Sequence, residues 1–130
     1  MSNGIEIGKL IFGAITSNEE LHNIVGDKVF PIIAEPETDF PFITYSRSNI
    51  YVVNQSKDGW FNDEASFNIQ IIDEDYMQSC HIANLVRQLF ENNAITGSDM
   101  KVYNIRMTGI SEMWSENAYV QSLYFSCSID

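Results

Sequence analysis

The spacing of apolar residues changes along the chain and predicts both helices and strands. Near the start, apolar positions recur every three or four residues, which predicts an amphipathic helix over 5–16. A second stripe of this period predicts a helix over 76–92, with Asp75 as its N-cap. The two stripes consist of Ile7, Leu10, Ile11 and Ala14, with Ile15 at the margin, and of Ile82, Leu85, Val86 and Leu89. Both need an apolar partner, so we expect the helices to pack on the same face of one sheet.

A shorter helix is predicted between the first helix and the first strand. Ser17 and Glu20 have the spacing of a capping box, in which the two residues satisfy each other's free backbone N–H groups. An apolar stripe follows, and Gly26 ends the helix. This stripe consists of Leu21, Ile24 and Val25.

Five segments rich in β-branched and aromatic residues predict strands. Alternation is clearest in the third and fifth segments, whose dry face should include Phe67, Ile69, Phe125 and Cys127. An Asp-Gly turn signal at 58–59 predicts a long β-hairpin that extends beyond the core. We therefore expect one α+β domain over 1–130, with a mainly antiparallel sheet of about four or five strands. The predicted strands are 29–33, 42–53, 60–72, 101–108 and 119–129.

All three prolines lie within the segment PIIAEPETDFPFITY, residues 31–45. Proline has no N–H group to donate to a sheet, so Pro36 belongs in a loop and Pro31 and Pro41 at strand ends or on an edge. Two interpretations of this acidic segment, which we call the proline loop, stay open. It displays a rigid surface to a partner, through Glu35, Glu37 and Asp39, or it protects a sheet edge from aggregation.

Composition narrows the classes of function. Eighteen acids against seven bases give a net charge of −11, which disfavours binding to nucleic acid because phosphate is gripped by Lys and Arg. The apolar runs are shorter than the roughly 18 residues that cross a bilayer. The first residues include Glu6 and Lys9 and lack a cleavage motif, so we expect no secretory signal and a protein that stays in the cell that makes it.

Candidate chemistry is sparse. Cys80 and His81 are neighbours in a predicted helix and therefore point about 100° apart, which disfavours a nucleophile–base pair. The acids of 73–75 suit a strand end and a helix N-terminus better than a metal site. There is no His or Cys spacing for a transition metal, no phosphate loop and no nucleophile elbow. We expect no enzymatic activity and no cofactor.

Aromatic residues gather on the predicted hairpin. Tyr51, Trp60 and Phe61 form either a local cluster or a contact surface for a partner. We regard them, with the three acids of the proline loop, as candidate interface residues.

The order and spacing of several short segments resemble the tail-completion or tail-terminator proteins of long-tailed phages. The most specific feature is Val25-Gly-Asp-Lys-Val-Phe-Pro31, followed ten residues later by Pro41-Phe-Ile-Thr-Tyr45. An N-terminal helix, Ala83-Asn-x-Val86 and a closing Tyr124-Phe-Ser strand complete the pattern, which covers nearly the whole chain. The chain departs from the pattern in the acidic region 62–64 and at 95–100.

The resemblance implies a small α+β domain without catalytic residues. Proteins of that family form a ring, commonly a hexamer, that caps the tail tube and joins it to the head connector, while DNA passes without specific binding. The implied location is the virion, after assembly in the bacterial cytoplasm. Two alternatives stay open: a head-closure or adaptor protein of the same junction, and a small ligand-binding or hydrolase domain with a pocket near Cys80 or His81.

Overall fold

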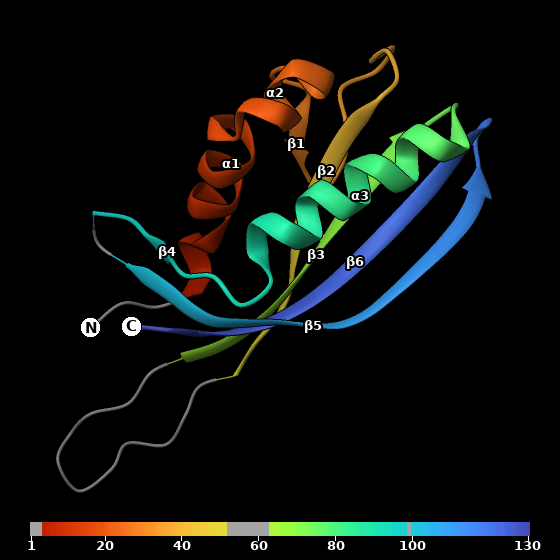
Figure 1. Ribbon diagram of the computed structural model, residues 1–130. Coiled ribbons are helices and arrows are strands. Elements are labelled where there is room, and N and C mark those ends of the chain that lie inside the picture. Colours follow the sequence, from red (N-terminus) through yellow and green to blue (C-terminus); the bar gives the residue numbers. More distant parts are fainter. Residues whose placement is uncertain (1–3, 52–62, 99) are drawn as a thin grey trace, which may run out of the picture.

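The computed structural model describes residues 4–51, 63–98 and 100–130 (Figure 1). Among these residues, no helix combines the length and the apolar character needed to cross a membrane. The elements are η1 (Gly4–Glu6), α1 (Ile7–Ser17), α2 (Glu19–Val25), β1 (Val29–Pro31), β2 (Phe42–Tyr51), β3 (Asp63–Asp73), α3 (Tyr76–Phe90), β4 (Ile95–Thr96), β5 (Lys101–Ser115) and β6 (Ala118–Ile129).

The described strands form one sheet in the order β1-β2-β3-β6-β5-β4. Neighbouring strands are antiparallel except β1 and β2, which are parallel. The sheet has six strands, where the sequence predicted about four or five. The additional strand, β4, is too short to show any alternation. The α+β class and the mainly antiparallel arrangement are confirmed.

Strand β5 continues to Ser115, so the predicted end at residue 108 was wrong. Its register against β6 shifts twice, between Tyr103 and Arg106 and between Met107 and Gly109. Each shift adds one residue and reverses which residues face a given side of the sheet. The period-2 pattern is therefore interrupted, although pairing continues along the strand.

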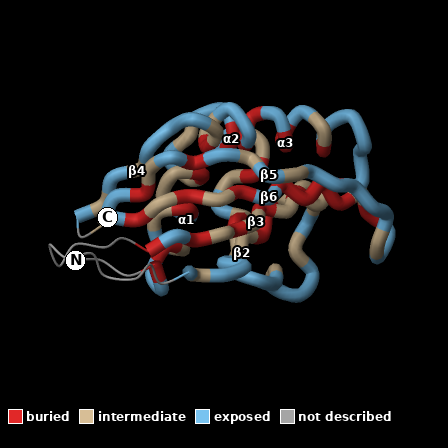
Figure 2. Tube along the Cα trace, turned by 90° about the horizontal axis from the view of Figure 1, so that it is seen from below, coloured by how far each residue is buried: buried red, intermediate tan, exposed pale blue. Residues whose placement is uncertain are grey.

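The three α-helices cover one face of the sheet, as Figure 1 shows. Helix α1 packs against β1 and β2, and α3 packs against β3 and β6. In Figure 2 the buried segments lie mainly where helices and sheet meet. We call the opposite side of the sheet the open face, because no described helix packs on it.

Three phenylalanines form the centre of the core. Phe67 of β3 and Phe125 of β6 stack with ring centroids 5.2 Å apart, and Phe90 of α3 lies 5.7 Å from each of them. All three are buried, as are Ile69 and Cys127, so the predicted dry face is confirmed. The core thus joins the last turn of α3 to the two central strands.

The N-cap of α2 is Asn18, and the predicted capping box at Ser17 was wrong. Ser17 is the last residue of α1, whereas an N-cap needs a non-helical backbone. Asn18 has that extended backbone, and its side chain accepts a hydrogen bond from the N–H of Leu21 at 3.0 Å. The prediction for α3 is confirmed, because Asp75 accepts from the N–H of Gln78 at 3.2 Å.

We expect Asn18→Ala to lower the free energy of unfolding by about 1 kcal/mol, because the N–H of Leu21 loses its acceptor. Urea denaturation followed by circular dichroism measures the change. Asn23→Ala, at an exposed position within the same helix, is the control and should cost nothing, since alanine favours helix. Equal losses in both variants would contradict the assignment of the cap.

Candidate functional site

The predicted aromatic interface is only partly within the described structure. Tyr51 ends β2 and is 54% exposed, which suits a contact residue. Trp60 and Phe61 lie outside the described residues, as does the turn at 58–59. The role of the hairpin between β2 and β3 as an interface therefore remains a prediction.

A second hairpin, made by β5 and β6, exposes apolar side chains that the sequence reasoning missed. Ile110, Met113 and Trp114 are each more than half exposed. They were overlooked because the predicted strand ended before them. The available signal was the group of apolar residues at 110, 113 and 114, which follows the predicted strand and precedes Tyr119, the residue that pairs with Trp114.

Aromatic residues of this hairpin meet the first turn of α3 on the helix side of the sheet. The Trp114 and Tyr119 rings lie 4.8 Å apart, and Tyr119 lies 5.2 Å from Tyr76, both in edge-to-face geometry. Ile110 and Trp114 alternate onto this same side of β5. We define the hairpin patch as Tyr76, Ile110, Trp114 and Tyr119. Large exposed apolar groups of this kind mark contact surfaces.

A polar network holds the hairpin patch against α3. The buried amide of Gln121 donates to Ser79 Oγ at 3.2 Å and to Glu112 Oε2 at 3.0 Å. The hydroxyl of Tyr76 donates to the same Glu112 oxygen at 2.8 Å. The bonds from Gln121 and Tyr76 lower the pKa of Glu112, and the bond to Glu112 raises the pKa of Tyr76 to about 12. Two elements far apart in sequence are thereby joined.

We expect Glu112→Gln to destabilise the protein at neutral pH, by an amount that shrinks as the pH falls. The folded-state pKa of Glu112 lies below its ordinary value of 4.5. Its contribution to the free energy of unfolding is therefore full above that value and is lost as the pH falls through the folded-state pKa. Urea denaturation at pH 7 and at lower pH measures the difference, with Glu116→Gln as the control. A difference independent of pH would show that the ionised state of Glu112 is not the source of its contribution.

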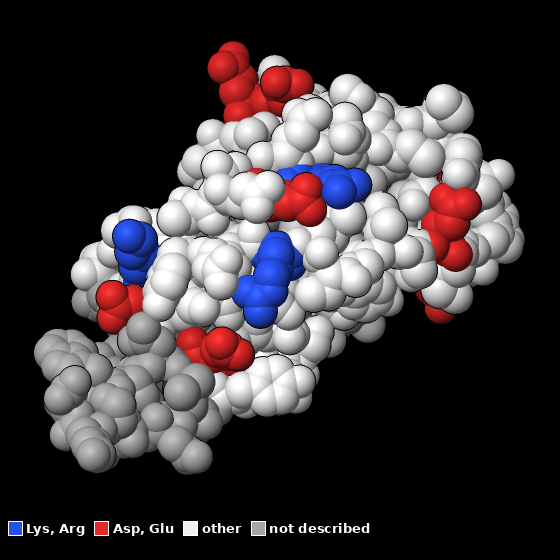
Figure 3. Space-filling view, turned by 60° about the horizontal axis from the view of Figure 1, so that its bottom comes forward, with Lys and Arg blue, Asp and Glu red and all other residues white. Residues whose placement is uncertain are grey.

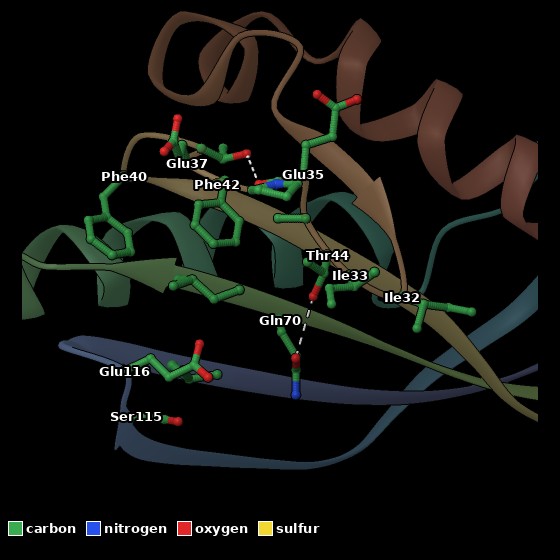
Figure 4. Close-up of a pocket in the computed structure, with 15 residues that line it drawn as sticks. Ile32, Ile33, Glu35, Glu37, Phe40, Phe42, Thr44, Gln70, Ser115 and Glu116 are labelled. Carbon is green, nitrogen blue, oxygen red and sulfur yellow. Dashed lines mark hydrogen bonds between the residues drawn. The ribbon is translucent and has the colours of Figure 1, made fainter.

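A cleft of about 490 Å³ lies on the open face, between the proline loop and the ends of β2, β3 and β6 (Figure 4). Ile32, Ile33 and Phe40 of the loop form one wall. Ser115 and Glu116, at the turn between β5 and β6, line the other side, across the strands from the loop.

The strand register explains how the sheet forms the floor of this cleft. Phe42, Ile72 and Val120 lie directly across from one another on β2, β3 and β6, and they make an apolar row. The next row is polar, with Thr44 donating to Gln70 at 3.4 Å and Gln70 donating to Ser122 at 3.3 Å. The floor of the cleft therefore has an apolar row at one end and a row of hydroxyl and amide groups next to it.

The proline loop is shaped by its own backbone. The N–H of Ile33 bonds the carbonyl of Pro31 at 2.6 Å and closes a three-residue turn around Ile32, which has a φ of 64°. This left-handed backbone is rare and strained for a β-branched residue. As a result Ile32 and Ile33, although isoleucines, are 77% and 78% exposed.

The predicted positions of the loop residues are confirmed. Pro36 lies in the connection, Pro31 ends the edge strand β1 and Pro41 immediately precedes β2. The candidate contact residues Glu35, Glu37 and Asp39 are all exposed, and their role as an interface stays a prediction.

The residues considered for catalysis are not brought together. His81 is exposed, and half-buried Cys80 contacts the amide of Gln121 on the helix side, away from the cleft. Asp75 caps α3, and Asp73 accepts a hydrogen bond from the N–H of Asp75. In the described ranges, no three His, Cys, Asp or Glu residues are grouped so that they could hold a metal ion.

Comparisons with known proteins show that chains of solved structures have a similar fold. A chain of the solved structure "Virion of native gene transfer agent (GTA) particle" is 14% identical, with a TM-score of 0.73, over 93% of this chain and 92% of its own. A second solved chain is 7% identical, with a TM-score of 0.63, over 95% of this chain and 90% of its own. No protein-family model matches the chain, and no curated protein matches it in sequence.

Proposed function

We propose that the chain is a structural protein of a phage or phage-like particle and has no enzymatic activity. The observation that carries this proposal is the likeness to a chain of a gene transfer agent virion, which covers more than nine-tenths of both chains. The order of short motifs that resembles tail-completion proteins supports it independently. The protein would act in the virion, after assembly in the cytoplasm of the bacterial host.

Within the particle we assign it the role of tail terminator, a ring at the head-proximal end of the tail tube. Its partners would be further copies of itself, the tail tube protein and the proteins of the head connector. The net charge of −11 suits a ring through which DNA passes, because carboxylates repel phosphate and do not retain it.

The distribution of exposed apolar side chains supports head-to-tail association. The hairpin patch includes Ile110 and Trp114 of β5, near one edge of the sheet, whereas Ile5 and Phe12 are exposed beside β2, near the other edge. A contact between two different surfaces of one chain closes into a ring when the rotation between copies permits it. Tyr51 is also exposed, but it pairs with Glu64 and lies on the open face of β2, so it would form a contact separate from the second surface.

Deletion of the gene from its phage or prophage tests this function. We expect filled heads and separate tails that cannot join, with tails abnormally long or ragged at the head-proximal end. Electron microscopy of the particles distinguishes the outcomes. Normal particles would refute a role in the virion, and normal tails beside leaking heads would favour the head-closure alternative.

A further inference from the structure

We infer that the cleft on the open face binds an extended segment of another protein that carries apolar side chains flanked by Lys or Arg. This inference rests on the cleft alone and does not depend on the proposed position of the chain in a ring. The volume of the cleft, about 490 Å³, lies in the range of sites that hold a ligand of several side-chain groups.

The walls of the cleft need an apolar occupant. Ile32 and Ile33 are each more than three-quarters exposed, and Phe40 stacks on Phe42 with ring centroids 5.8 Å apart. Figure 4 shows the two rings above the sheet at one end of the cleft. An apolar side chain placed between these groups removes them from water, which is the main favourable term in binding.

The rim of the cleft selects the charge of the occupant. Glu35 and Glu37 lie on the loop side, and Glu116 lies across the strands at the β5–β6 turn (Figure 4). Among the described residues that line the cleft, all three charged residues are acidic. All three acids are exposed, so they attract a basic segment through long-range electrostatics that salt screens.

The same charges disfavour a second copy of this chain as the occupant. The chain has 18 acids and only 7 bases, and its own exposed Trp114 lies two residues from each of the acids Glu112 and Glu116. On the side of the molecule shown in Figure 3, the Lys and Arg residues are scattered and do not form a patch. A hairpin inserted from another copy would bring further carboxylates to an acidic rim.

The loop is organised before any partner arrives. Thr38 donates to the carbonyl of Glu35 through both its N–H group, at 3.3 Å, and its hydroxyl, at 2.6 Å. The ammonium of Lys28 donates a hydrogen bond to the carbonyl of Asp39 at 3.2 Å. These bonds and the prolines reduce the entropy that binding would cost. The strained turn at Ile32 is maintained although it leaves two isoleucines in water, as is typical of functional sites.

Two short peptides test the inference on the intact chain. In one, leucine, phenylalanine and isoleucine alternate with lysine, and in the other glutamate replaces each lysine. We expect the lysine peptide to bind at least about tenfold more tightly at low salt, to lose affinity as salt is added and to shift the backbone amide signals of Thr44 and Gln70. Fluorescence anisotropy and nuclear magnetic resonance measure the two effects.

Matched variants locate the binding. Glu37→Gln with Glu116→Gln should weaken the lysine peptide about threefold or more, whereas Glu19→Gln with Glu20→Gln, the same change of charge on α2, should leave it unchanged. Ile33→Ser, at an exposed position, should weaken both peptides without affecting folding.

Several results would overturn the inference. They are equal affinity for both peptides, equal effects of the two double variants, or no binding of either peptide at about 1 mM. Amide shifts at Thr44 and Gln70 that depend on protein concentration without peptide would identify a second copy as the occupant. Because none of these measurements uses the particle, failure here is distinguishable from failure of the proposed tail role.

Discussion

Phe67→Ala is expected to lower the free energy of unfolding by about 3–5 kcal/mol. Phe67 is fully buried and contacts the rings of both Phe90 and Phe125, so its removal leaves a cavity between α3 and the central strands. A domain of this size is typically stable by only about 5–15 kcal/mol, so the loss is a large part of the total. Urea denaturation measures the change.

His81→Ala, at an exposed position on α3, is the control for Phe67→Ala and should change the free energy of unfolding by less than about 0.5 kcal/mol. If Phe67→Ala prevents folding altogether, Phe67→Leu keeps an apolar side chain at the site and should give a smaller, measurable loss. A loss no larger for Phe67→Ala than for His81→Ala would show that these rings do not form the centre of the core.

Trp114→Ala is expected to weaken association between copies by about 2 kcal/mol, or roughly 30-fold in concentration, while the protein still folds. Trp114 is 57% exposed, so association could bury a large aromatic surface. Purified chain is added to joining-defective tails from the deletion strain, and the concentration that restores half of the head–tail joining is measured. Loss of the edge-to-face contact with Tyr119 should cost the fold only about 0.5–1.5 kcal/mol.

Tyr124→Ala, which removes an exposed aromatic ring from the open face, is the control for Trp114→Ala and should leave the required concentration unchanged. If Trp114→Ala also left it unchanged, the hairpin patch would not be the contact between copies. A much lower stability with unaltered association would show instead that Trp114 acts within the subunit.

Together the hairpin patch and the cleft would give the chain two different contacts. The hairpin patch lies on the helix side of the sheet, and the cleft lies on the open face. The first is suited to a further copy of the chain and the second to a basic segment of a different protein. A subunit placed at a junction between two assemblies needs this separation, because each surface must remain available while the other is occupied.

Elements whose side chains repeat with a clear period could be predicted from the sequence alone. Alternation from Ala65 to Ile71 predicted a strand with one dry face, and the stripe around Ile82 predicted α3, because burial on one side imposes a regular spacing. Local chemistry predicted the cap at Asp75, since its acceptor and donor are three residues apart. The proline positions predicted a loop because a missing N–H is a property of each residue alone.

Features that depend on residues far apart in the chain could not be predicted in this way and are set by the folded arrangement. The two bulges in β5 interrupt the alternation along that strand, so the sequence pattern did not predict its outer half, which carries Ile110 and Trp114. The network from Gln121 to Glu112 and Tyr76 joins β6, β5 and α3. The cleft exists because β1 pairs parallel to β2, which returns the proline loop over the ends of the strands. Strand register and strand pairing determine which of these residues come close together. Neither can be predicted from the spacing of residues within one segment.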